Sequence, residues 1–350
     1  MAHLTFDGVR VSGVSACVPI GVQRNADLTD LIPPSEIART IENIGIVERR
    51  IAAPDVSASD LCETAASRLL EMTDVDRDSI DVLIFMSQLP DYPVPATSPS
   101  LQHRLGLPES CACFDISLGC SGYIYALATA FAYASLPAVR RVLVLDGETF
   151  SKVVSPKDKV NAPLYGDAGT ATLVEKGGGG RSWFGLHSNG SGLDKIRIRA
   201  GGARLRASIE TVQSREREEG NVRSEHELYM DGMEVFNFTM KVVPQSVLAL
   251  LKYAGLQLAD VDYLVFHQAN KFMTDFFAKK LKCPKEKIPY SLGRFGNTSS
   301  ASIPLTITTE LRDALGERKR LLMSGFGAGL SWGTALMDVS DCSIPPLAER

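Results

Sequence analysis

Continuous apolar runs alternate with helical stretches along the whole chain. The runs 80–85, 141–145 and 261–266 are almost continuously apolar, which is typical of strands buried on both faces of a sheet. Residues 122–134 instead place apolar side chains at helical spacing, including Tyr123, Leu127 and Phe131. Strands that alternate with helices predict an α/β architecture with mostly parallel central sheets.

Two distant stretches share one pattern. Leu69-Leu70, an acidic turn and the apolar run that ends at Phe85 are followed 181 positions later by Leu250-Leu251, an acidic turn and the run that ends at Phe266. In a second repeated pattern, the apolar run 141–145 corresponds to the apolar run that ends at residue 323. We interpret these echoes as a duplication that divides the chain into residues 1–176 and 177–350. Chance similarity between apolar strands is the alternative.

Two segments interrupt this regularity. Four consecutive glycines at 177–180 cannot hold a regular element, so they predict a linker or a hairpin turn where the halves meet. Residues 201–227 are highly charged and have little apolar periodicity, and we expect an exposed loop or flap there.

Bulk composition excludes several classes of protein. The 350 residues carry a formal net charge of -4, which offers no basic field for nucleic acid. No window holds eighteen apolar residues in a row and the N-terminus lacks the pattern of a signal peptide, so we expect a cytoplasmic protein without a membrane span. The seven cysteines form no C-x-x-C pair, which disfavours a disulfide framework or a structural metal site. Either all the thiols are buried packing groups, or one is reactive.

Cys120 is the candidate for a reactive thiol. It lies in a turn of small residues between an apolar strand and the helix that begins near residue 122, with glycines at 119 and 122. The start of that helix directs unpaired N–H groups and a positive dipole end toward the sulfur, which predicts a lowered thiol pKa and a site for an oxyanion. Cys111 and Cys113 lie in the strand, where thiols are usually inert. A buried structural cysteine is the alternative for Cys120 as well.

Two polar residues could complete a site. His267 directly follows the apolar run 261–266, and the ends of strands are where α/β folds place chemistry. The other four histidines lie in polar or irregular contexts that suit surface side chains. Asn297 lies in a glycine-flanked loop before a helix, and its amide could donate to an oxyanion. The alternatives are a histidine that caps the core and an asparagine that caps the helix.

Set side by side, these segments resemble the β-ketoacyl-acyl carrier protein synthase III family of the thiolase superfamily. The similarity spans nearly the whole chain. In order, the matching motifs are GIVERR (45–50), DISLGCSGYIYAL (115–127), YGDAGTATL (165–173), MDGMEVF (230–236), HQAN (267–270), GNTSSASIP (296–304) and GFGAGLSWG (325–333).

The resemblance implies a thiolase-like, five-layered αβαβα fold made of two similar halves, with Cys120, His267 and Asn297 as catalytic residues. It implies that the backbone N–H groups of Cys120 and Ala328 hold an oxyanion, and that Asn270 and the loop from Gly327 to Gly329 line a pantetheine channel. It also implies a homodimer in which the partner's segment 93–95 closes the acyl pocket. The implied reaction is a decarboxylative condensation of an acyl thioester with malonyl-acyl carrier protein. Coenzyme A or carrier-protein thioesters are its substrates, and no metal or redox cofactor is required.

Some positions depart from the family's pattern. Arg39 and Asn43 align with the Trp and Arg that commonly hold the adenine of coenzyme A, and Ala328 replaces a usual glycine. With the long charged segment 201–227, these departures suggest a specialised pathway member with a carrier-bound or unusual acyl donor.

Lys271, Lys279 and Lys280 fall on the helix predicted after His267. They form either a solvated face or a basic patch that docks an acidic acyl carrier protein.

Two other functions remain possible on the sequence alone. The same residues could transfer the acyl group to a hydroxyl or an amine, with His267 as general base. The chain could also be a non-catalytic subunit that binds carrier protein.

Overall fold

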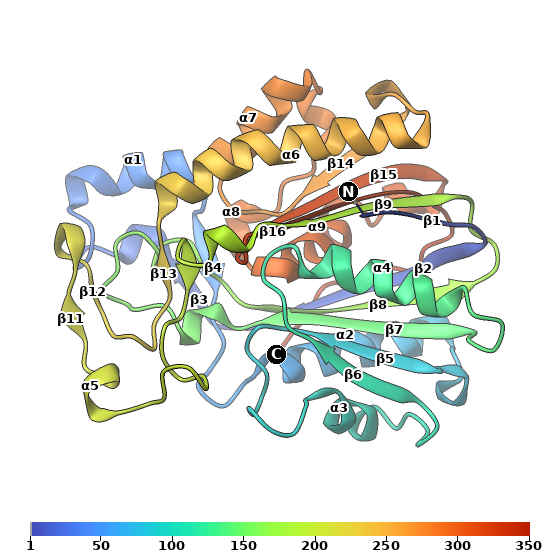
Figure 1. The fold of residues 1–350 in the computed structure, drawn as a ribbon, viewed down its shortest axis with the longest axis horizontal. Helices are drawn as coiled ribbons and strands as arrows, with labels where there is room; N and C mark the ends of the chain where they lie inside the picture. Colours follow the sequence, from blue (N-terminus) through green and yellow to red (C-terminus); the bar gives the residue numbers. More distant parts are fainter. Residues whose placement is uncertain (1) are drawn as a thin grey trace.

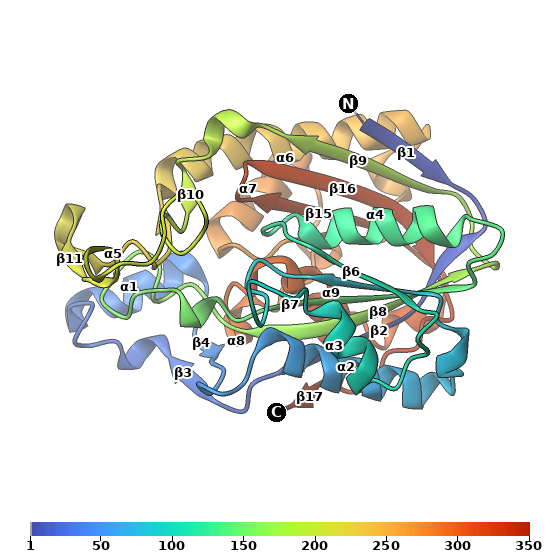
Figure 2. The same ribbon diagram turned by 60° about the horizontal axis from the view of Figure 1, so that its bottom comes forward.

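The chain folds into five layers around two sheets in a computed structural model that describes residues 2–350. Figures 1 and 2 together show the order of the layers: a pair of helices, the first sheet, a central pair of helices, the second sheet and another pair of helices. The predicted α/β fold of two similar halves is confirmed. Among the described residues, every helix is too short or too polar to cross a membrane.

The first sheet has six strands in the order β17-β2-β8-β7-β5-β6. Their bounds are β2 (Val9–Val18), β5 (Val82–Met86), β6 (Ala112–Ile116), β7 (Arg141–Glu148), β8 (Ala168–Lys176) and β17 (Ala348–Glu349). The central pairs β7-β5 and β5-β6 are parallel, and β8 is antiparallel to both of its long neighbours.

The second sheet has five strands in the order β1-β9-β16-β15-β14. Their bounds are β1 (Ala2–Phe6), β9 (Ser182–Ser188), β14 (Tyr263–Phe266), β15 (Lys319–Gly327) and β16 (Ser331–Val339). Here β14 and β15 are parallel, whereas β16 is antiparallel to β15 and to β9.

Pairs of helices form the three helical layers (Figures 1 and 2). Helices α2 (Ala58–Thr73) and α3 (Ser98–Arg104) cover the outer face of the first sheet, and α6 (Gly232–Ala254) and α7 (Lys271–Leu281) that of the second. Helices α4 (Gly122–Ala134) and α9 (Ser302–Glu310) lie between the sheets. The largest apolar cluster fills this middle layer, where Tyr123 and Phe131 of α4 are almost fully buried. Burial of such a layer is the main force that holds the two sheets together.

The remaining α-helices and strands gather beyond one end of the two sheets (Figure 2). They are the helices α1 (Pro34–Ile44), α5 (Ile209–Val212) and α8 (Leu292–Phe295), and the strand pairs β3 (Val22–Arg24) with β4 (Glu48–Arg50), β10 (Ile196–Arg197) with β13 (Tyr229–Met230), and β11 (Arg215–Glu216) with β12 (Val222–Arg223).

The 181-residue echo corresponds to equivalent elements. Helix α2 and strand β5 in the first half match α6 and β14 in the second, and the leucine pairs at 69–70 and 250–251 are buried in both. The proposed boundary at 176/177 falls in the turn between β8 and β9, where Gly177 and Gly178 have φ of +95° and +72°. The terminal strands cross this boundary, because β1 joins the second sheet and β17 joins the first.

The charged segment 201–227 is more ordered than its sequence predicts. It contains α5, β11 and β12, and Asn221, Arg223 and Ser224 are buried. Arg223 pairs with the buried Asp158 at 3.4 Å, and Asn221 accepts a hydrogen bond from the Lys159 N–H at 2.8 Å. The expectation of an exposed loop or flap is confirmed for most of residues 201–218 and is wrong for residues 221–224, where polar contacts and ion pairs bury the chain.

Candidate active site

Cys120 lies directly before α4, in the turn that follows β6. The turn closes through a 2.7 Å hydrogen bond from the Gly122 N–H to the Gly119 carbonyl. β15 passes so close that a side chain at Gly327 would place its Cβ 3.0 Å from the Cys120 sulfur. The Cys120 side chain is only partly covered, since it faces two cavities. The chain thus presents the sulfur to space that a substrate could fill.

His267 follows the last residue of β14 and is only 2% exposed. Its N–H donates to the Ser324 carbonyl of β15 at 2.8 Å, its Nδ1 lies 2.8 Å from the Ser302 hydroxyl, and Phe326 packs edge-on against its ring. Burial penalises the imidazolium and lowers the His267 pKa to about 3, although the Ser299 backbone acts in the opposite direction. The ring is therefore neutral at pH 7, with Nε2 left for a ligand.

Both backbone polar groups of Asn297 are hydrogen-bonded to the segment 164–166. Its N–H donates to the Leu164 carbonyl at 2.8 Å, and its own carbonyl accepts from the Gly166 N–H at 3.1 Å. The side-chain Oδ1 accepts from the Ser299 N–H at 2.9 Å. Because the oxygen is engaged in this way, the amide nitrogen is the end of the side chain that remains for the cavity.

Ser299 connects the three predicted residues. Its hydroxyl lies 3.6 Å from the Cys120 sulfur, and its N–H donates to Oδ1 of Asn297. Its backbone acts to raise the pKa of His267. Its φ of +52° is one that serine rarely adopts, so the loop holds it in a strained conformation. Cys120, His267 and Asn297 also line a common cavity, together with Gly327.

The predicted lowering of the thiol pKa is not what the structure gives. Burial raises the Cys120 pKa to about 11, against weaker lowering by the Ser299 hydroxyl and the Cys120 N–H. The buried carboxyls of Glu148 and Asp146 add to the rise. At rest the site therefore contains a neutral thiol beside a neutral imidazole. Sequence reasoning took the helix dipole into account but not the loss of water around the sulfur.

Two backbone donors flank the sulfur. Among residues 2–350, the Ala328 N–H has no backbone acceptor, and the Cys120 N–H acts on its own sulfur, whose pKa it lowers. A side chain at Gly119 would place its Cβ 3.5 Å from the Ala328 nitrogen, so the loop after β15 lies against the turn that holds Cys120. This arrangement suits an oxyanion hole, since N–H groups at a helix start stabilise developing negative charge.

Two cavities meet at Cys120, and Tyr165 and Ile196 also line both. The first cavity, of about 300 Å³, is bounded by Thr40 and Ile44 of α1 and by the start of α7. Of the predicted channel residues, Asn270 and Gly327 line this first cavity. Asn270 also caps α7 by accepting from the Met273 N–H at 2.9 Å.

The second cavity, of about 420 Å³, lies on the other side of the sulfur. Ala328 and Gly329, two residues of the predicted channel loop, line this cavity and not the first. Its other lining residues are Gln88, Leu89, Ser117, Leu118, Gly119, Phe150, Leu193, Arg197, Ile198 and Leu228. A sulfur between two cavities can receive an acyl group from one side and retain it on the other.

The three predicted docking lysines do not form one patch. Lys271 begins α7 and pairs with Asp275 at 2.6 Å, whereas the exposed Lys279 and Lys280 lie at the other end of the helix. Eight residues of α-helix span about 12 Å, and a spacing of nine residues turns the side chain by about half a circle. Lys271 and Lys280 therefore face in opposite directions, which a count of helical spacing alone did not resolve.

Other thiols and imidazoles lie away from the site. Burial raises the pKa of Cys111 to about 12, and Cys113 also has a raised pKa. His187 stacks on Trp332 with ring centroids 5.1 Å apart, and His226 hydrogen-bonds the Thr211 hydroxyl at 3.0 Å. None of these four side chains lines either cavity at Cys120.

Comparison with known proteins gives one consistent family. The model described as 3-oxoacyl-[acyl-carrier-protein] synthase III matches residues 114–192, and the model of its C-terminal part matches residues 251–339. A β-ketoacyl-[acyl-carrier-protein] synthase III from Rhodopirellula baltica is 35% identical, with 94% of this chain and 98% of the relative covered.

Solved structures agree with this result. A 3-oxoacyl-(acyl-carrier protein) synthase from Burkholderia xenovorans is 40% identical over 100% of this chain and 99% of its own, with a TM-score of 0.93. The priming β-ketosynthase of the R1128 polyketide pathway is 29% identical over 96% of this chain and 97% of its own, with a TM-score of 0.82.

Proposed function

Because the chain belongs to the 3-oxoacyl-[acyl-carrier-protein] synthase III family, we propose that it condenses an acyl thioester with malonyl-acyl carrier protein. The reaction gives a 3-oxoacyl thioester for fatty acid or polyketide biosynthesis. The observation that supports this function best is that Cys120, His267 and Asn297 line one cavity although three distant segments supply them.

In the first half-reaction, the Cys120 sulfur attacks the thioester carbonyl and loses its proton, and the carrier thiol leaves with a proton. The N–H groups of Cys120 and Ala328 would hold the oxyanion of the tetrahedral intermediate. Since the resting thiol is neutral, deprotonation accompanies substrate binding rather than preceding it. The Ser299 hydroxyl, 3.6 Å away, would stabilise the thiolate as it forms.

In the second half-reaction, the malonyl thioester places its carbonyl oxygen between Nε2 of His267 and Nδ2 of Asn297. Loss of carbon dioxide leaves an enolate that the two donors stabilise and that then attacks the acyl-enzyme. A neutral His267 suits this step, because an imidazole whose pKa is about 3 donates a hydrogen bond without being an imidazolium that would protonate the carbanion. The Ser302 hydroxyl also accepts from the Gln268 N–H at 3.2 Å, so its own proton is available for Nδ1 and the ring proton for Nε2.

Intact-mass analysis and carbon dioxide release test this function. Incubation with acyl-CoA or acyl-carrier donors is expected to add one acyl group to the protein and none to Cys120→Ala. His267→Ala and Asn297→Ala are expected to acylate but to release little carbon dioxide from malonyl-carrier protein. Acylation followed by transfer to a hydroxyl or an amine, without carbon dioxide release, would contradict condensation and favour simple acyl transfer. No adduct with any donor would favour a non-catalytic binding role.

Acyl carrier protein and a second copy of the chain are the proposed partners, and no metal or redox cofactor takes part in the proposed steps. Residues of α1 and α7 line the first cavity, and we expect the pantetheine arm to enter between these two helices. Arg39 and Asn43 lie exposed on α1 near this entrance. These positions lack the aromatic side chain that would stack on adenine, which favours carrier-bound donors over coenzyme A.

Replacing lysines with glutamate at one end of α7 or at the other tests which end binds the carrier protein. If the carrier protein docks on the lysines, Lys279→Glu with Lys280→Glu weakens its binding, measured by titration calorimetry. Lys271→Glu is the comparison at the other end of the helix. Unchanged affinity in both variants would remove the lysines from the docking surface. Sedimentation of the purified chain tests the homodimer.

A further inference from the structure

The second cavity is lined mainly by apolar and small residues and by a cationic side chain, that of Arg197. Leu89, Leu118 and Phe150 are among its apolar lining residues, and Arg197 of β10 also lines it. Among the described residues that line this cavity, no carboxylate is present. A plain alkyl chain would leave the guanidinium without a partner from the ligand.

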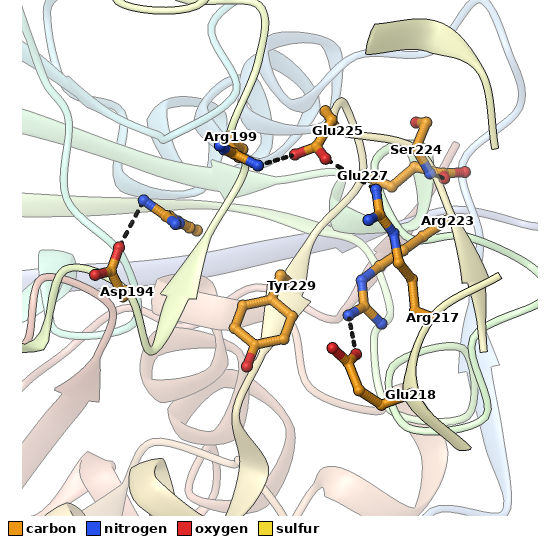
Figure 3. Close-up of a pocket in the computed structure, with 10 residues that line it drawn as sticks. Asp194, Arg199, Arg217, Glu218, Arg223, Ser224, Glu225, Glu227 and Tyr229 are labelled. Atoms are coloured by element: carbon orange, nitrogen blue, oxygen red, sulfur yellow. Dashed lines mark hydrogen bonds and ion pairs between the residues drawn. The ribbon is translucent and has the colours of Figure 1, made fainter. Parts of the chain in front are cut away.

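A surface pocket next to this cavity, called the basin below, is not itself an anion site. It is lined by Asp194, Arg197, Arg199, Arg217, Glu218, Arg223, Ser224, Glu225, Glu227 and Tyr229. Figure 3 shows Arg199 directed toward Glu225, and Arg223 reaches Glu218 at 3.4 Å. Arg217 also pairs with Glu225, at 2.8 Å. The four arginines of the basin face four carboxylates in its lining, so their charges cancel. Arg197 differs from the other three because it alone lines both the basin and the cavity that contains Cys120.

The partner of Arg197 is weakly held. Its Nη1 lies 2.6 Å from Oδ1 of Asp194, whose side chain is 71% exposed. An exposed ion pair of this kind contributes little to stability, so a carboxylate arriving from the cavity can replace Asp194 at low cost. Arginine suits such a ligand because its planar guanidinium can bind a carboxylate through two parallel hydrogen bonds.

Arg197 and Cys120 line the same cavity. Arg197 follows Ile196, which lines both cavities, while Cys120 lies where the two cavities join. An acyl group bound to the sulfur that extends into the second cavity shares that cavity with Arg197. We propose that Arg197 is a specificity-determining residue that binds a carboxylate at the distal end of the acyl group, so that the preferred donor is an ω-carboxyacyl thioester. This inference rests on the proposed function and names its substrate class.

Matched pairs of donors test the proposal. The full-length protein is incubated with glutaryl or pentanoyl thioesters, and with adipoyl or hexanoyl thioesters, each on coenzyme A and on acyl carrier protein, and the acylation rate of Cys120 is measured by intact mass. The wild-type protein is expected to prefer the carboxylated member by about tenfold to a hundredfold, the range for one charge-assisted hydrogen bond. Arg197→Gln is expected to abolish that preference, and Arg197→Glu to reverse it. Asp194→Asn is expected to increase it, because the competing carboxylate is gone.

Arg199→Gln is the matched control, since Arg199 lies in the basin but does not line the cavity. Its donor preference should equal that of the wild-type protein. Acylation that favours the alkyl donors in wild type, or a preference that Arg197→Gln leaves unchanged, overturns the carboxylate site while leaving the condensing function intact. Failure of every donor, on coenzyme A and on carrier protein alike, overturns both.

Discussion

The pH dependence of Cys120 alkylation separates the two expectations for its thiol. With a pKa of about 11, roughly one sulfur in ten thousand is a thiolate at pH 7. The alkylation rate should then rise about tenfold for each pH unit from 7 to 10, because only the thiolate reacts. Between pH 9 and 10 alone, a thiol with an ordinary pKa of 9.0 would gain only about twofold. A thiol with a pKa lowered below 7 would gain nothing.

The assay is alkylation by iodoacetamide, followed by intact mass and by peptide mapping to separate Cys120 from the partly exposed Cys113. Cys120→Ala gives the background rate. Ser299→Ala removes the hydroxyl that lowers the Cys120 pKa and should shift the profile to still higher pH. A rate that levels off below about pH 9 would refute the dominance of burial and would restore the helix dipole as the stronger effect.

Three further predictions follow from the packing of the site. Gly327→Ala places a Cβ 3.0 Å from the Cys120 sulfur and should slow acylation by about a hundredfold, whereas Gly316→Ala, with open space around it, should not. A rate close to that of wild type for Gly327→Ala would contradict the close approach of β15. Ser302→Ala removes the partner of His267 Nδ1 and should slow carbon dioxide release about tenfold while acylation stays unchanged; an equal loss in both steps would argue for general misfolding. Burial raises the Asp146 pKa from 3.8 to about 8, so the folded state retains a proton that the unfolded chain has lost, and wild-type stability falls as pH rises between these values. Asp146→Asn lacks this titration, and its melting temperature relative to wild type should rise from pH 4 to pH 8; a constant difference would count against the raised pKa.

The sequence was informative where a local pattern has only one structural solution. Apolar runs such as 80–85 form central strands, and the positions of Cys120 and His267 after strands were evident without coordinates. The pairing of β1 and β17 with the opposite halves was not, because strands of five and two residues have no periodic signal of their own. The order within 221–224 also escaped notice, since ion pairs such as that of Arg223 with Asp158 depend on residues far away in the chain.

Within the site, Ser299 and Ser302 were missed. Their sequence context of small polar residues indicates a helix start, and that is also where they lie. Their spacing of two and five residues after Asn297 was the available signal, but a bond to a sulfur 179 residues away has no local signature. The direction of the Cys120 pKa was wrong for a similar reason, because desolvation depends on packing from every side.

The exchange of terminal strands makes each half dependent on the other. Cleaving the backbone within the glycine turn at 177–180 would yield two polypeptides, each of which retains a strand that belongs to its counterpart's sheet. Neither piece could close its own sheet when expressed alone. When expressed together, they should reassemble as a split protein, with the sulfur contributed by one piece and the imidazole and carboxamide by the other.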